Sequence, residues 1–210
     1  AIVIGLGKRV FSLKSAMDAW IGGIKSMVIA VTILALAFAL KSVISDMQLA
    51  EWLVEITEGI LSGKILPLIV FIVAMLIAFA TGTSWGTNSI LMPLVIPIAA
   101  GVSGAEGVLT PTIIASIGAV LTGAVFGDHC SPISDTTILS SMASGADHIS
   151  HVRTQIPYAV TAAVIAAVFG FIPAGFGVPV WLLLLLGIAA IIIFVKFFGR
   201  RVEDAVESTA

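Results

Sequence analysis

Long apolar segments separated by short polar ones dominate the pattern of the chain. Apolar runs with little or no charge cover residues 26–45, 65–80, 90–102, 113–126, 156–174 and 179–198. A helix of about 20 apolar residues can cross the ~30 Å hydrocarbon core of a bilayer. The pattern therefore predicts an all-α membrane protein built as a polytopic helix bundle.

Residues 64–102 are too long for one straight span. A continuous helix would extend roughly 58 Å at ~1.5 Å per residue. Its middle, Thr81–Ser89, carries two glycines and six small polar side chains. We predict a re-entrant helical hairpin with this polar tip inside the membrane. Two ordinary short spans joined by a Thr/Ser loop are the alternative.

A second interruption is expected within residues 110–144. Thr110 and Pro111 are typical of a helix start. A half-helix over 113–126 leads into the polar stretch Gly127–Thr137, and a second half-helix resumes over 134–142. Because Gly127 and Pro132 disfavour a continuous helix, we predict a broken transmembrane helix here.

The flanks divide the chain into three parts. Residues 1–25 are a basic cytoplasmic or interfacial segment, 26–198 the transmembrane part, and 199–210 a polar tail. Within the first part, residues 15–24 are either an interfacial amphipathic helix or a basic flank before a span. A further interfacial helix is predicted around residues 49–60.

The distribution of basic residues predicts the orientation. Basic residues favour the cytoplasmic side, so both termini are placed there, in a multi-pass protein of the cell membrane. The hairpin enters and leaves on the outer side, the loop with Arg153 faces inward, and residues 145–153 form a solvated polar connection containing Asp147, His148 and His151.

Composition supports the membrane assignment and excludes other classes. Of 210 residues, 59% are hydrophobic and 10% charged, against about 25% charged in soluble domains. No basic stripe suggests nucleic-acid binding. The single cysteine excludes an internal disulfide and a Cys-pair zinc motif. Because the chain starts at Ala1 without methionine, we expect a fragment, or one half of a longer transporter.

The two interruptions contain the side chains that could bind an ion. Polar groups at membrane depth must face protein, water or an ion, and paired helix breaks are the best pointer to a transporter site. Their side chains are mostly hard oxygen donors, which suit sodium better than a soft metal. A carboxylate in low dielectric also has a raised proton affinity, so sodium and a proton can compete for it. No cofactor is expected beyond these transported ions.

Several side chains allow two interpretations. Asp128 is either an ion or proton ligand or is tied to a partner such as His129 or a lysine. Asp135 is either a second ligand for sodium or the N-cap of the second half-helix. His129 is a proton relay or a structural histidine, and Cys130 a packing residue. A zinc site from residues 128, 129, 130 and 135 is disfavoured, because consecutive residues rarely converge on one tetrahedral ion.

The segments Gly82–Thr87 and Gly127–Thr137 together resemble the NhaC-type sodium/proton antiporters of the ion transporter superfamily, which include malate/lactate-exchanging relatives. The resemblance covers about residues 15–198 and looks like the C-terminal half of a family member. It implies an inverted-repeat architecture whose other half is absent here. The site residues it implies are Thr83, Ser84, Thr87, Asn88, Asp128, Ser131, Ser134, Asp135 and Thr136.

The expected function is sodium/proton antiport through competition for a buried carboxylate. Coupled exchange of a small organic acid or amine is the alternative. An intramembrane enzyme is disfavoured, because no second reactive constellation or cofactor motif accompanies the polar stretch. The expected partners are the lipid bilayer and a missing N-terminal half, and a homodimer is left open.

Overall fold

The computed structural model describes residues 2–8, 10–47, 62–104 and 108–199. It contains two compact units, residues 1–43 and 44–210, which are described separately. The first holds α1 (Ile2–Gly7) and most of α2 (Leu13–Asp46). Because α2 is one continuous 34-residue helix, the segment 15–24 and the first predicted span share a single helix. The interfacial helix predicted around residues 49–60 lies outside the described residues.

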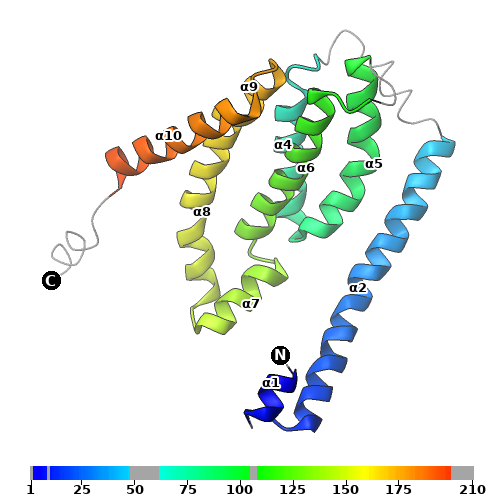
Figure 1. Ribbon diagram of the computed structural model, residues 1–210, viewed down its shortest axis with the longest axis vertical. Coiled ribbons are helices and arrows are strands. Elements are labelled where there is room, and N and C mark those ends of the chain that lie inside the picture. Colours follow the sequence, from blue (N-terminus) through cyan, green and yellow to red (C-terminus); the bar gives the residue numbers. More distant parts are fainter. Residues whose placement is uncertain (1, 9, 48–61, 105–107, 200–210) are drawn as a thin grey trace. The chain divides into compact units, whose positions relative to one another are not determined.

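The second unit is built from helices throughout its described part (Figure 1). In chain order they are α4 (Leu66–Thr81), α5 (Ser84–Ser103), α6 (Pro111–Cys130), α7 (Asp135–Ser144), α8 (His148–Ile165), the π-helical η1 (Ala166–Phe171), α9 (Ile172–Gly175) and α10 (Val180–Phe198).

Four of the described helices are long and apolar enough to cross a membrane. They are α5, α6, the continuous helix His148–Gly175, and α10. The last two correspond to the predicted spans 156–174 and 179–198, although the former begins earlier, at His148. The side chains of α10 are largely exposed, as expected for a helix whose apolar surface faces lipid.

Close packing of α6 against α4 forms the centre of the second unit. A Cβ atom at Gly123 would lie 2.6 Å from Phe71 O, and one at Gly127 would lie 2.6 Å from Met75 O. Both distances are too short for any side chain, so the two backbones touch along a small-residue seam, as in tightly packed membrane helices. Asp128 follows directly after this seam.

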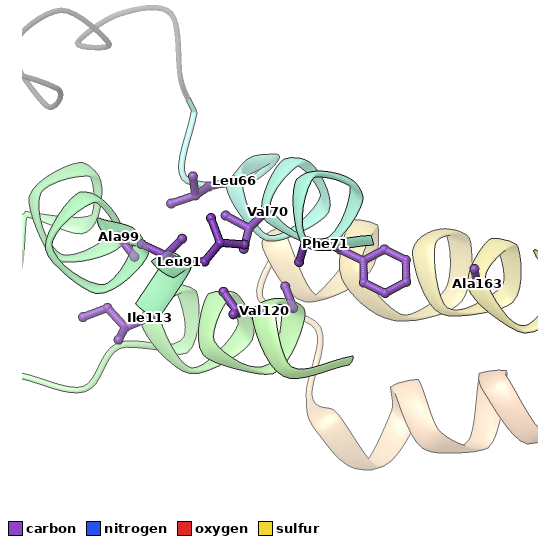
Figure 2. Packing of buried hydrophobic residues seen from close by; sticks show 11 residues of the cluster. Leu66, Val70, Phe71, Leu91, Ala99, Ile113, Val120 and Ala163 are labelled. Carbon is purple, nitrogen blue, oxygen red and sulfur yellow. The ribbon is translucent and has the colours of Figure 1, made fainter. Parts of the chain in front are cut away.

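The buried apolar cluster lies around the same helices (Figure 2). Leu66, Val70 and Phe71 of α4 pack with residues of α5 and α6, and Ala163 extends the cluster to α8. The Phe71 ring also contacts the Phe171 ring, with centroids 4.7 Å apart. This cluster sets the spacing of the helix ends that carry the polar groups.

The α4–α5 turn is shorter than predicted. Only Gly82 and Thr83 separate two antiparallel helices (Figure 1). Gly82 closes α4 with φ 66°, and the Thr83 hydroxyl accepts a hydrogen bond from Gly86 N at 3.2 Å. This N-cap lets the helix begin at Ser84. The predicted non-helical tip over 81–89 is therefore wrong for residues 84–89.

The second interruption is present but lies later than predicted. α6 continues through Gly127 and Asp128 to Cys130, and residues 131–134 separate it from α7. Pro132 removes a backbone donor and so ends the helix one turn beyond the predicted point. As predicted, Thr110 caps the start of α6, where its hydroxyl accepts from Ile113 N. The interruption thus lies at the end of a full-length helix.

Candidate functional site

A buried carboxylate surrounded by hydroxyl groups lies at the junction of α6 and α7. Asp128, in the last turn of α6, is 6% exposed. Ser134 Oγ donates to its Oδ1 at 2.7 Å, and Thr136 Oγ1 donates to its Oδ2 at 3.1 Å. The two hydroxyl oxygens are themselves only 2.8 Å apart. The interruption at 131–134 makes this cluster possible, because it turns α7 back beside the last turn of α6.

The α4–α5 turn reaches the same carboxylate. Ser84, the first residue of α5, lies with its Oγ 3.4 Å from Asp128 Oδ2. The turn also touches the interruption through backbone, since a Cβ at Gly82 would lie 2.9 Å from the carbonyl carbon of Ile133. The two interruptions predicted from the sequence therefore meet at Asp128.

A pocket of about 180 Å³ opens beside the carboxylate. Its walls come from α6, α7 and α8, and every lining residue has a polar or charged side chain. The lining residues are Asp128, His129, Thr136, Thr137, Ser140, His151 and Gln155. Within the described residues, Asp128 forms no ion pair, so its charge is balanced only by hydroxyl dipoles. A carboxylate among hydroxyl oxygens beside an open pocket is a candidate ligand for a hard cation.

Four other predicted residues lie near the cluster without contacting Asp128. Thr83 caps α5, and Thr87 is buried and donates to Thr83 O at 2.9 Å. Ser131 is buried and accepts from Ile133 N at 3.4 Å. Asn88 Oδ1 is buried and has no hydrogen-bond partner in the described structure. Asn88 lies one turn beyond Ser84 on the same face of α5, so its oxygen is an acceptor that could bind a cation.

The side chains of Asp135 and His129 make no hydrogen bond to Asp128. Asp135 is exposed, and its Oδ1 accepts from Thr136 N at 2.8 Å. It is the first residue of α7, whereas Ser134 occupies the N-cap position, so the alternative of Asp135 as N-cap is wrong. His129 is exposed, and its Nδ1 lies 3.0 Å from Val125 O. Cys130 is buried. No group of three or more His, Cys, Asp or Glu side chains in the described residues could hold a metal.

The start of α8 also contacts the region of the second interruption, which the sequence pattern did not predict. Asp147 N-caps α8 through Ser150 N, and His148 and His151 in its first turn both contact Ser141. The predicted solvated loop over 145–153 is therefore wrong from His148 onward. The hydrogen bond from Ser150 N to its carboxylate holds the pKa of Asp147 below the usual value. The Asp-x-x-Ser spacing of a helix cap was the available signal.

Comparison with known proteins gives relatives for most of the chain. An "Uncharacterized protein" of Haemophilus influenzae is 43% identical over 168 residues, which is 80% of this chain and 31% of that protein. The "Malate-2H(+)/Na(+)-lactate antiporter" of Bacillus subtilis is 34% identical over 179 residues, 83% of this chain and 37% of the relative. The "Arginine/ornithine antiporter ArcD" of Halobacterium salinarum is 35% identical over 95 residues, 45% of this chain and 18% of the relative.

The chain spans about a third of the length of the first two relatives. No solved structure matches it. The model of the Na+/H+ antiporter family matches residues 1–175, a range that contains both interruptions and the whole carboxylate cluster. Together with the four apolar helices, this marks a multi-pass membrane protein. The chain therefore belongs to the Na+/H+ antiporter family.

Proposed function

We propose that this chain forms part of a sodium/proton antiporter in which Na+ and H+ compete for Asp128. The observation that carries the proposal is the triangle formed by Asp128, Ser134 and Thr136. Its three edges measure 2.7, 3.1 and 2.8 Å. Each edge needs one proton to be a hydrogen bond.

The proton count of this triangle explains the competition. Two hydroxyl groups supply two protons, so an ionised carboxylate leaves one of the three edges without a hydrogen bond. A proton on Asp128 supplies the missing donor and closes the ring. A sodium ion instead binds the lone pairs of the same oxygens, as hard cations prefer. The two loaded forms therefore exclude each other, which is the requirement for exchange.

We extend the proposal to the subfamily of the chain and to its arrangement in the membrane. We assign the chain to the NhaC-type branch, with α4 and α5 as a re-entrant hairpin and both termini cytoplasmic. The remaining length of the relatives, about two thirds, is expected to supply the other half of an inverted repeat. Asn88 Oδ1, buried and without a partner, is available as a further oxygen ligand.

The experiment is exchange in proteoliposomes containing the full-length protein. An imposed sodium gradient should drive proton movement, and Asp128→Asn should abolish it. Asp135→Asn is the matched control, because it neutralises an exposed carboxylate of the same motif with no contact to Asp128. Normal exchange by Asp128→Asn would refute the assignment of that carboxylate.

A second function is favoured by the pocket beside Asp128. Its volume of about 180 Å³ exceeds what one bare ion needs, and His151 and Gln155 in its wall suit the polar group of a small organic acid. The Bacillus subtilis relative is named for malate and lactate. Proton movement that requires such an acid on one side of the membrane would identify coupled organic-acid exchange.

A further inference from the structure

An apolar groove adjoins the polar pocket beside Asp128. The groove has a volume of about 410 Å³ and lies between α4, α6 and α8. Its walls are mostly aromatic and aliphatic, and include Phe71, Val125, Phe126, Ala159, Ala162 and Ala166. The groove and the polar pocket have two lining residues in common, His129 and Gln155. The two cavities are therefore neighbours that meet at these two side chains.

The few polar side chains of the groove leave it mostly carbon surface. Thr122 Oγ1 donates to Gly118 O at 2.7 Å, and His129 Nδ1 lies 3.0 Å from Val125 O. These groups are therefore engaged by the backbone of their own helix. The Gln155 amide, in contrast, has no hydrogen-bond partner among the described residues. A free amide thus lies where the apolar groove meets the polar pocket.

The charges of the two cavities favour a cation over an anion. Among the described residues, Asp128 is the one acidic side chain that lines either cavity, and no lysine or arginine does. An organic acid would place a second negative charge beside Asp128, and like charges repel strongly where little water screens them. An ammonium group brings the opposite charge and three N–H donors. Suitable acceptors in the polar pocket are the Asp128 carboxylate, Thr136 Oγ1 and the Gln155 amide oxygen.

The groove extends far enough from Asp128 to hold a hydrocarbon arm. Its α6 wall runs from Thr122 to His129, which corresponds to ~10 Å along the helix at ~1.5 Å per residue. A bare sodium ion makes no use of this surface. We propose that the groove and the polar pocket form one binding site for organic ammonium ions with an apolar arm, in which the ammonium group takes the place of sodium at Asp128.

This proposal rests on the proposed function, because it takes Asp128 as the sodium ligand. The ammonium group and sodium then compete for the same carboxylate, whereas the arm adds binding energy that sodium lacks. The length of the arm therefore sets the affinity of the ligand, and the charge of its head decides whether it binds at all.

Binding of n-alkylammonium ions to the purified full-length protein tests the proposal. Equilibrium dialysis in sodium-free detergent solution gives the affinity, with empty micelles as the background. We expect n-hexylammonium to bind about fifteenfold more tightly than n-butylammonium, at about fourfold per buried methylene. Added sodium should displace both amines competitively. Hexanoate, which has a similar arm and the opposite charge, should not bind.

Variants locate the arm and the head separately. Ala159→Phe fills the groove, so the advantage of n-hexylammonium over n-butylammonium should fall to less than about threefold. Val160→Phe is the matched control, because Val160 is the next residue of α8, is 47% exposed and lines neither cavity. It should bind as wild type does. Asp128→Asn should lose both amines, and Asp135→Asn should keep them.

Two results would overturn the proposal. Equal affinities of wild type for the two amines would show that no arm enters the groove, and this comparison needs no variant. An unchanged preference in Ala159→Phe would show that lipid or the rest of the protein fills the groove. Sodium-driven proton movement in proteoliposomes without amine tests antiport independently. Exchange without amine binding would therefore refute only the groove, and displaceable amine binding without exchange would refute only the proposed function.

Discussion

The two helix interruptions use similar residues for different purposes. In the α4–α5 turn, the Thr83 hydroxyl caps its own helix and Thr87 bonds back to Thr83 O. In the α6–α7 interruption, Ser134 occupies the N-cap position but makes no side-chain cap, and its hydroxyl donates to Asp128 instead. The threonine hydroxyls of the first interruption thus bond to backbone, whereas the Ser134 hydroxyl of the second bonds to the carboxylate.

The comparison shows what makes an interrupted helix a site. Ser84 is the one side chain of the first interruption that reaches Asp128, at 3.4 Å. The second contributes two donors at shorter distances. We therefore expect the first interruption mainly to border the site, and the second to supply the side chains that bind the ion.

The largest effect is expected from separating α6, which carries Asp128, from α4. In Gly127→Ala, the new Cβ would lie 2.5 Å from Ala78 Cβ and 2.6 Å from Met75 O. Because a backbone atom cannot move aside, we expect a loss of about 3 kcal/mol in the free energy of unfolding. Detergent titration of unfolding measures it.

Gly118→Ala is the matched control, since this glycine lies on the same helix with nothing within 4 Å of the added atom. It should be neutral or stabilising by up to about 1 kcal/mol, because alanine favours helix. Equal losses in the two variants would contradict the close α4–α6 contact.

The contact between the two interruptions is tested next at Gly82. Alanine there is strained by φ +66° and would meet Ile133 C and O at 2.9 Å. Gly104→Ala carries the same strain at φ +63° but meets nothing within 4 Å. We expect Gly82→Ala to lose about 2 kcal/mol more than Gly104→Ala in unfolding free energy. Equal unfolding midpoints would show that the two interruptions do not touch.

Because Ser134 and Ser84 lie at different distances from Asp128, we expect their alanine variants to change the affinity for sodium by different amounts. Ser134→Ala removes a donor 2.7 Å from the carboxylate, and Ser84→Ala removes one at 3.4 Å. A hydrogen bond to a charged group contributes about 1.5 kcal/mol or more, so the sodium concentration for half-maximal exchange should rise about tenfold in Ser134→Ala. Ser84→Ala should change it less than about threefold. The reverse order would place the ion at the first interruption.

The smallest effect is expected at the N-cap of α8. Asp147 resembles Thr83, because its side chain bonds to the backbone of the helix that it begins. The lowered pKa of Asp147 means that its carboxylate contributes stability above the ordinary value, about 3.9, and loses it as pH falls through the lower folded-state value. Asp147→Ala should therefore speed amide exchange in the first turn of α8 at neutral pH. Below the folded-state pKa, the variant and wild type should exchange alike.

The sequence predicted the long apolar helices, because a run of apolar residues marks each of them. Both interruptions were found, since Gly82 and Pro132 act locally on the backbone, but the first ends six residues earlier than predicted and the second begins one turn later. The partners were harder to predict. Ser84 meets Asp128 across 44 positions of sequence, and His148 meets Pro132 across 16. Such contacts depend on how α4, α6 and α8 pack. This packing cannot be predicted from the spacing of residues along a single helix.

The glycine seam between α4 and α6 also limits how the protein can move. At Gly123 and Gly127 the backbones are so close that sliding either helix by one residue would drive a methyl-bearing position into the other main chain. The two helices must therefore travel as one rigid block. Any change in the access of ions to Asp128 is therefore expected to leave the contact between α4 and α6 intact.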